Sequence, residues 1–291
     1  MGRVRVSRGR LLAIGVLAAV VGGAVWYINR SEPIPTRPPA SAPNVGSCYA
    51  VTPDQAQQAM PWPGGARACT SAHTAEVYHV GQVDHDLISQ ARKAKGDTAK
   101  IAMNLMFAEV RRACGVFASD YLGGDWHKDQ VTLLANWIAP AANGFFGCAL
   151  VQITGPGGND YVTRDASVKG IGDTGALATG CVTRTGDNVR YASCTEPHTG
   201  EFVGTYRITP DNAAFDAKAV ADAANQGCAK TALAYLGLSE SANRPDLHVG
   251  YVGPTTASTW LGSDQTFDCY ASATSEIRGT IRNLGTRPLP T

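Results

Sequence analysis

Two histidine–glutamate pairs occur at the same spacing in the two halves of the chain. Each pair sits in a nine-residue stretch, Cys69–Val77 or Cys194–Phe202, and both stretches read C-T-x-x-H-T-x-E-apolar. The pairs are His73 with Glu76 and His198 with Glu201. Because imidazole and carboxylate groups both ligate zinc, each pair offers half of a metal site of the kind a metal-dependent hydrolase uses.

A structural role is the simpler interpretation of the same residues. No third ligand stands at a telling spacing beside either pair, and His-x-x-Glu is not the H-E-x-x-H helix motif of zinc proteases. A histidine placed just after a disulfide cysteine can hydrogen-bond the backbone of the turn, while the glutamate takes a backbone N–H or a nearby arginine. We therefore predict that these four residues stabilise the fold, and that the protein carries no catalytic residue, metal or cofactor.

Other catalytic patterns are weak or missing in the sequence. There is no G-x-S-x-G elbow of a serine hydrolase. The stretch Gly155–Gly158 lacks the Gly-Lys-Ser/Thr ending of a phosphate-binding loop. Asp120, Asp125 and Asp129 lie near a Gly-Gly loop, where acidic side chains are usually solvated rather than paired for glycoside hydrolysis. The protein is therefore predicted not to be an enzyme.

Eight cysteines divide evenly between the two halves. They are Cys48, Cys69, Cys114, Cys148, Cys181, Cys194, Cys228 and Cys269. In an exported chain this even number predicts four disulfides. If Asp187 and Asn188 form a tight hairpin turn, Cys181 and Cys194 lie directly opposite each other, within disulfide reach. The repeat then pairs Cys48 with Cys69, and the remaining bridges are Cys114–Cys148 and Cys228–Cys269.

The elements that position these residues also recur in both halves. Apolar residues at helical spacing surround Cys114 and Cys228, so each of these cysteines is expected on the buried face of a helix, the second one running from an N-cap at Asp211 to a stop at Gly237. Strand-like runs follow the helices, at 131–138, 145–153, 247–252 and 266–270. We predict an α+β fold of two tandem disulfide-stapled units. Each is a small antiparallel sheet with one helix, in the order strand, strand, helix, strand, strand.

The N-terminus has the features of a membrane anchor. Arginines at positions 3, 5, 8 and 10 precede an uncharged run of 18 residues, 11–28, which is about long enough to cross a bilayer as a helix. Arginines before the run place residues 1–10 in the cytoplasm and the rest of the chain outside. A cleaved signal peptide is the alternative, but no small-x-small cleavage site follows the run. We expect a single-pass protein of the cell membrane with an extracytoplasmic ectodomain.

Composition divides the rest of the chain. Residues 29–47 contain five prolines and are predicted to form a semi-stiff linker that holds the ectodomain away from the membrane. The first unit is expected at 48–153, a Gly-rich linker at 154–179, the second unit at 180–275 and a loose tail at 276–291. The net charge is +1 and no basic stripe is present, so nucleic acid is not an expected partner.

The repeated motif, with a helix cysteine and a Trp-containing loop before the last cysteine of each half, resembles the septum formation-related domain. The matching motif residues are Cys69, His73, Glu76, Cys194, His198 and Glu201, within a resemblance that covers roughly residues 48–269. That family occurs in membrane-anchored or exported proteins of high-GC Gram-positive bacteria, and its name implies an envelope role near division. The anchor, the linker, the disulfide-framed repeats and the lack of a catalytic pattern favour a non-enzymatic module that binds an envelope or division protein or a wall polymer. A metal-dependent envelope hydrolase using the His/Glu pairs is the alternative.

The predicted topology is testable with intact spheroplasts. Because the arginines orient the anchor with its N-terminus inside, protease added from outside should digest the chain beyond residue 47, as followed by a C-terminal epitope on immunoblots. A cytoplasmic marker protein serves as the control and should stay intact. Survival of the C-terminal epitope beside an intact marker would rule out this orientation.

Overall fold

The computed structural model describes residues 33–291 except 159, 187, 211 and 212. The predicted anchor at 11–28 and its arginines therefore lie outside the described residues. Among the residues that are described, no helix is both long enough and apolar enough to cross a membrane.

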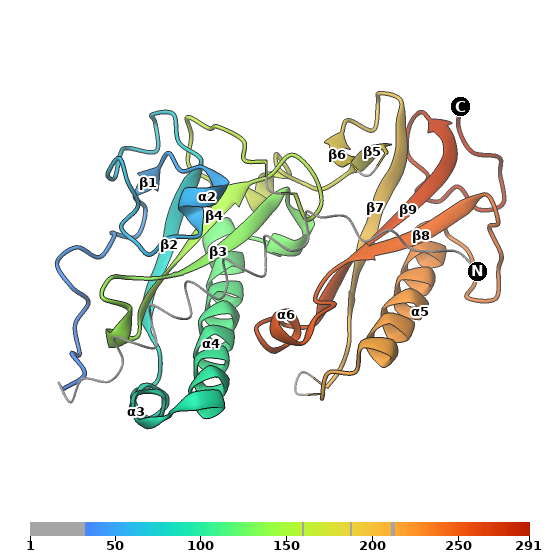
Figure 1. Ribbon diagram of the computed structural model, residues 1–291. Coiled ribbons are helices and arrows are strands. Elements are labelled where there is room, and N and C mark those ends of the chain that lie inside the picture. The colour runs from blue at the N-terminus through green and yellow to red at the C-terminus, as the bar shows by residue number, and fades with distance from the viewer. Residues whose placement is uncertain (1–32, 159, 187, 211–212) are drawn as a thin grey trace.

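The first unit is a four-stranded antiparallel sheet with a long helix packed against it (Figure 1). Its strands lie in the order β1-β2-β4-β3. Their bounds are β1 Cys48–Tyr49, β2 Ala75–Gln82, β3 Val131–Trp137 and β4 Phe145–Gln152. The long helix α4, Gly96–Leu122, follows the short helices α2 (Pro53–Ala56) and α3 (His85–Lys93). A left-handed Gly123, with φ of 77°, ends α4, as glycine does at many helix C-termini.

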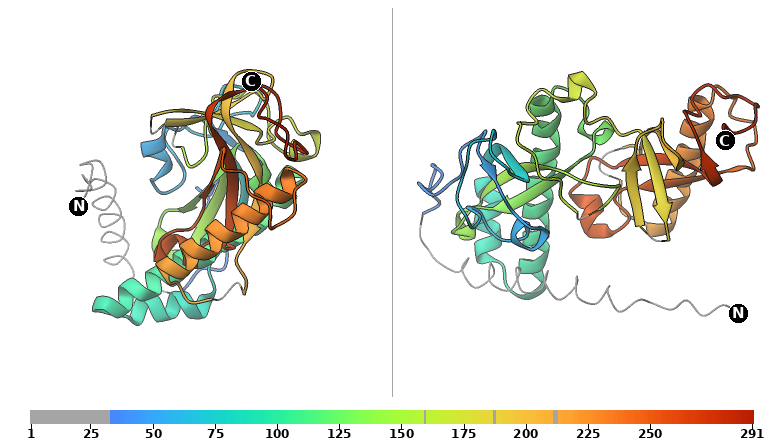
Figure 2. Two further views of the ribbon diagram at one scale, coloured as in Figure 1. Left: turned by 90° about the vertical axis from the view of Figure 1, so that its right-hand side faces the viewer. Right: turned by 90° about the horizontal axis from the view of Figure 1, so that it is seen from above.

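The second unit repeats this architecture beside the first (Figures 1 and 2). Its sheet has the order β6-β5-β7-β9-β8, so β5, β7, β9 and β8 take the places of β1, β2, β4 and β3, and β6 is added at the edge. The strands are β5 Cys181–Thr185, β6 Asn188–Ala192, β7 His198–Arg207, β8 Leu247–Val252 and β9 Thr266–Ile277. The helices are α5, Ala217–Tyr235, and α6, Ala257–Leu261.

The α+β class, the antiparallel sheets and the four disulfides agree with the sequence prediction. The expected single helix per unit is wrong, because α2 and α3 belong to the first unit and α6 to the second. The second unit also has a third strand before its main helix. Helix α5 begins at Ala217 behind an Asp216 N-cap, whose carboxylate accepts from the Ala219 amide; the predicted cap, Asp211, lies outside the described residues.

Disulfides fasten each main helix to its sheet. Cys114 on α4 bridges to Cys148 on β4, and Cys228 on α5 bridges to Cys269 on β9. All four of these cysteines have no exposed surface and lie within the two main apolar cores. The other two bridges, Cys48–Cys69 and Cys181–Cys194, tie the motif-bearing turn to the neighbouring strand.

The hairpin that carries Cys181 differs from the predicted register by two residues. Thr185 pairs with Asn188 and Cys181 pairs with Ala192, so Cys194 lies two residues beyond the strand position opposite its partner. The bridge still closes with a Cα–Cα distance of 5.1 Å because the chain turns back after Ala192 toward β7. The disulfide was predicted correctly from a turn placed one residue too far along the chain.

Three segments expected to be extended or loose pack against the units instead. In the first linker Ile34 packs against the first core and Pro43 is buried. The Pro35 carbonyl accepts a hydrogen bond from the side-chain amide of Gln82 at 2.8 Å. The segment after β4 buries Val168 and Leu177 in the first core, and the segment after β9 buries Ile281 and Leu284 in the second. Apolar side chains spaced through these polar segments provide this burial, so the C-terminal segment is not a loose tail.

The helix–sheet bridge should contribute more stability than the hairpin bridge. Replacing both Cys228 and Cys269 with Ala opens a loop with a sequence separation of 41, against 13 for Cys181 and Cys194. Loop entropy alone makes the first loss about 1 kcal/mol larger, out of roughly 3–4 kcal/mol. Denaturant unfolding of the two double variants measures this, with the hairpin pair as the matched control. An equal or larger loss for the hairpin pair would contradict the expectation.

Candidate functional site

The carboxylate of Glu76 holds three parts of the first unit together. It lies on β2 with 2 % of its surface exposed. It accepts hydrogen bonds from the Tyr121 hydroxyl of α4 at 2.6 Å, the Ser167 hydroxyl at 2.5 Å and the Val168 amide at 2.8 Å. Burial and then the bond to Glu76 raise the pKa of Tyr121, which keeps this hydroxyl a donor. Strand, helix and the segment after β4 therefore meet at one buried group.

Glu201 repeats this arrangement in the second unit. It lies on β7 and accepts from the Tyr235 hydroxyl at 2.5 Å, the Thr280 hydroxyl at 2.6 Å and the Ile281 amide at 2.8 Å. Each tyrosine follows the helix cysteine of its unit by seven residues, a spacing that the sequence shows and that our sequence analysis missed. The other two donors of each carboxylate come from the dipeptides Ser167-Val168 and Thr280-Ile281. These dipeptides follow the last cysteine of their unit at different distances, so only the fold shows that they are equivalent.

The motif histidines are buried beside these carboxylates. Nδ1 of His73 lies 2.8 Å from the Ser71 carbonyl, and Nδ1 of His198 lies 2.7 Å from the Glu196 carbonyl. A carbonyl oxygen only accepts, so Nδ1 carries a proton and donates. No described residue hydrogen-bonds Nε2 of either ring. Both histidines thus hydrogen-bond the backbone of the turn after the disulfide cysteine.

Metal ligation by these motifs meets two obstacles. Ligand atoms of Cys48, Cys69, His73 and Glu76 lie within 4.8 Å of one another, but both sulfurs belong to a disulfide and neither is a thiolate. The glutamate oxygens already accept three hydrogen bonds. The second unit brings together Cys181, Cys194 and Glu201 in the same disulfide-bonded state, on a different sheet. The two His/Glu pairs therefore do not form one composite site.

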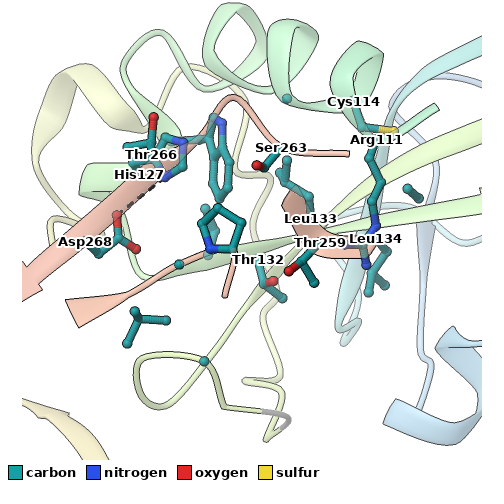
Figure 3. Close-up of a pocket in the computed structure, with 18 of the residues that line it drawn as sticks. Arg111, Cys114, His127, Thr132, Leu133, Leu134, Thr259, Ser263, Thr266 and Asp268 are labelled. Atoms are coloured by element: carbon teal, nitrogen blue, oxygen red, sulfur yellow. Dashed lines mark ion pairs between the residues drawn. The ribbon is translucent and has the colours of Figure 1, made fainter. Parts of the chain in front are cut away.

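A cleft of about 1570 Å³ lies between the two units (Figure 3). The first unit lines it with Arg111, Leu133 and Trp126, and the second unit with Thr259 and Asp268, among other residues. Trp126 is half-buried, whereas Trp62, Trp137 and Trp260 are buried in the cores. The cleft is thus the place where the structure brings aromatic, cationic and acidic side chains of both repeats to one concave surface.

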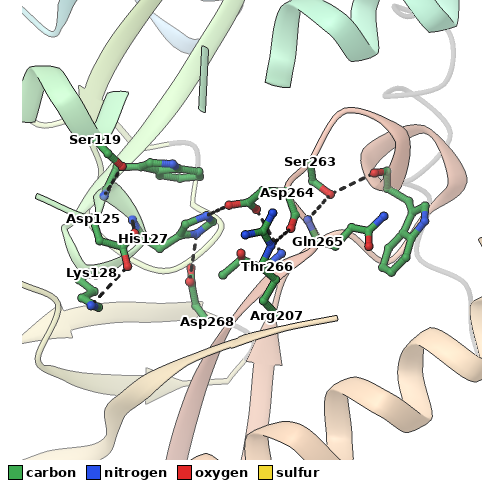
Figure 4. A network of polar contacts seen from close by, with 12 residues as sticks. Ser119, Asp125, His127, Lys128, Arg207, Ser263, Asp264, Gln265, Thr266 and Asp268 are labelled. Carbon is green, nitrogen blue, oxygen red and sulfur yellow. Dashed lines mark hydrogen bonds and ion pairs between the residues drawn. The ribbon is translucent and has the colours of Figure 1, made fainter. Parts of the chain in front are cut away.

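His127 joins the units across one wall of this cleft (Figure 4). It belongs to the short 3-10 helix Trp126–Lys128 of the first unit and stacks on Trp126 with 3.8 Å between ring centres. Its Nε2 lies 3.1 Å from an Asp264 oxygen, and its Nδ1 lies 3.4 Å from an Asp268 oxygen. Both carboxylates come from the second unit, so the imidazole ring is held between two acidic partners.

Electrostatics make this contact an ion pair near neutral pH. Burial disfavours the imidazolium, but the hydrogen bonds and charges of Asp264 and Asp268 outweigh burial and raise the pKa of His127 to about 9. Burial also opposes ionisation of Asp264, yet the bond from His127 lowers the pKa of Asp264 to about 2. At the more buried Asp268, burial dominates and raises the pKa. Asp264 is therefore the main counter-charge.

Sequence reasoning missed His127, Asp264 and Asp268. His127 and Asp264 are 137 residues apart in the sequence, so no local spacing marks them as partners. They also have no equivalents in the other repeat, and a search for repeated residues passes over them. Of the aspartates weighed for glycoside chemistry, Asp125 caps the 3-10 helix through the His127 amide and Asp129 is buried at 6 % exposure. Burial first, and then Asp125, raises the pKa of Asp129.

Two disulfide-stapled α+β repeats with a shared cleft define a tandem-repeat protein. Residues 45–269 match the family model described as septum formation, which is more than half of the chain. The chain therefore belongs to the septum formation family, as its motifs predicted, and this membership suggests a role related to septum formation. No curated protein and no solved structure gives a match.

The structural role of His198 predicts a stability loss confined to its own unit. His198→Ala leaves the Glu196 carbonyl without its buried donor, which should cost about 1–3 kcal/mol. Thermal unfolding, monitored by hydrogen exchange in each unit, should show a loss of stability in the second unit and little change in the first. His248→Ala is the matched control, because His248 is exposed on β8 of the same unit.

Added zinc tests whether His198 is a metal ligand instead. Metal binding to the folded state would raise the melting temperature by mass action. We expect neither zinc nor a chelator to shift the wild-type curve. A zinc-dependent rise that His198→Ala abolishes would replace the structural interpretation with a metal site.

The His127 ion pair predicts a loss of stability at alkaline pH. Because the folded pKa of about 9 exceeds the ordinary value of 6.5, its contribution is complete below about pH 6.5 and is lost as the pH rises through 9. Denaturant unfolding should show a decrease on the order of 2 kcal/mol over this range. His127→Gln should flatten that decrease, and His248→Gln should leave it in place. An unchanged slope in His127→Gln would show that another group titrates.

Proposed function

We propose that this protein is a non-enzymatic, membrane-anchored, extracytoplasmic envelope protein that acts in septum formation by binding a partner in the cleft between its two units. Membership of the septum formation family supports the division role. The arginine-flanked apolar run at 11–28 supports the anchor. Four disulfides in the described chain, with no free cysteine, suit an oxidising compartment outside the cytoplasm.

The state of the titratable groups supports binding rather than catalysis. The motif residues His73, Glu76, His198 and Glu201 are all at most 3 % exposed, so a substrate does not reach them. In the cleft, His127 is a cation near neutral pH and both its ring nitrogens face aspartates. A general base needs a free lone pair near the operating pH, which this imidazole does not offer.

The cleft carries the proposal, because it is a concave surface that only the pair of units can form. Tyr161 and Tyr191 line it together with Trp126, and all three are partly exposed. Arg111 and Arg112 add cationic groups from α4, and both are exposed. Aromatic rings with polar tips and arginines suit an extended polar segment, such as a wall polymer or a loop of a division protein.

Localisation in dividing cells tests the proposal. A fluorescent fusion of the full chain should concentrate at the septum, and a variant with Trp126→Ala and Arg112→Glu should lose several-fold of that enrichment while it stays in the membrane. Arg184→Glu is the matched control. It changes the charge by the same amount as Arg112→Glu, and Arg184 is exposed and lies outside the cleft. An even distribution of the wild-type fusion around the cell would overturn the septal role.

Isolated cell walls then separate the classes of partner and of activity. Sedimentation of the full-length protein in detergent with wall sacculi, reduced in the cleft variant, would identify a wall polymer as the partner. Cleft-dependent septal localisation without wall binding would identify a protein partner. Release of soluble wall fragments that a chelator abolishes would contradict the non-enzymatic proposal and favour the metal-dependent hydrolase.

A further inference from the structure

The described chain begins at one end of the first unit. Ile34 packs against the first core, and the carbonyl of Pro35 accepts from the Gln82 side chain, which also donates to the Asn143 carbonyl at 2.9 Å. Gln82 is the last residue of β2, two residues before the N-cap of α3. The start of the described chain, α3 and the N-terminal end of α4 all lie toward the bottom of Figure 1. The chain thus enters the fold at the end that carries α3.

This attachment limits how far the unit can stand from a membrane anchor. The predicted span ends at Ile28, and Pro33 follows five residues later. Even a fully extended chain covers at most about 18 Å over that distance. Since the chain is already attached to the first unit at Ile34 and Pro35, the rest of the proline-rich segment adds no further reach. If the proposed anchor holds, the α3 end of the first unit must lie close to the lipid surface.

The surface near this end carries exposed lysines and exposed apolar side chains. Lys93 ends α3 and Lys95 precedes α4, and both are exposed without an ion pair to any described residue. Lys100 is also exposed, although Asp97 pairs with it at 3.0 Å. Ile101 and Leu105 follow on the solvent side of α4 with 60 % and 44 % of their surfaces exposed. Their four-residue spacing puts both on one side of the helix.

We infer that Lys93, Lys95, Ile101 and Leu105 form a membrane-docking patch that seats the first unit on an anionic bilayer surface. The inference rests on the proposed anchor. The lysines are placed to meet anionic headgroups, and the two apolar side chains enter the boundary between headgroups and acyl chains. A single span with a free linker would let the two units rotate freely. Docking at this patch would instead fix the orientation of the cleft relative to the membrane.

Lysine labelling of the full-length protein in vesicles tests the patch. Reductive methylation, read by mass spectrometry, is compared between vesicles of phosphatidylcholine alone and vesicles that also contain phosphatidylglycerol. We expect labelling of Lys93 and Lys95 to fall several-fold with the anionic lipid. Lys218 is the internal control, because it is exposed on α5 of the second unit and should label equally in both. Ile101→Ser with Leu105→Ser should restore the labelling, and Val116→Ser, another exposed apolar position, should not.

Carbonate extraction of the same vesicles separates the two possible failures. If the protein is extracted, the anchor is wrong and the patch has lost its basis. If the protein resists extraction but Lys93 and Lys95 label like Lys218 in both lipids, the anchor stands and the docking patch is refuted. Protection that grows with protein concentration in phosphatidylcholine alone would assign the patch to a second copy of the chain and also overturn the inference.

Discussion

A buried carboxylate in each unit is the constraint on which the rest of the structure depends. An acidic group removed from water is costly unless hydrogen bonds replace its hydration. Glu76 and Glu201 each meet this requirement with a tyrosine hydroxyl, a Ser/Thr hydroxyl and a backbone amide. These donors come from the main helix and from the segment after the last strand. The carboxylate is satisfied only when strand, helix and that segment are all in place, so one residue makes three elements interdependent.

The histidine and the disulfides complete this arrangement by fixing the ends of the motif strand. The motif cysteine bridges to the neighbouring strand, the histidine closes the turn, and the helix cysteine fastens helix to sheet. Each unit is therefore held internally by groups that are buried or covalent. The contact between units includes groups that are more open to solvent, since Asp264 and Asp268 of the His127 ion pair are partly exposed.

The sequence predicts the contacts within each unit better than the contact between the units. The repeat made the cysteine pairs and the paired sheets predictable from the sequence, because each feature occurs once in each half in the same order. The donors to the carboxylates were accessible only in part. Tyr121 and Tyr235 keep a fixed distance from their helix cysteine, but Ser167 and Thr280 come after loops of different length. The packing of 276–291 was missed because Ile281 and Leu284 are isolated apolar residues without a period.

The cleft could not be predicted from the sequence for the opposite reason. It is built where the two copies differ, so the repeat does not mark its residues. Aligning the bridging cysteines Cys148 and Cys269 sets Asp268 against Gly147 and Asp264 against Asn143. The Trp126–His127 dipeptide that precedes β3 likewise has no counterpart in the residues before β8. The contact is heterologous, because the 3-10 helix before β3 of the first unit meets the start of β9 of the second, so each copy uses a different surface at the boundary. Divergence at these few positions gives one unit a cation and the other its counter-charges, which turns a duplicated scaffold into a single asymmetric site.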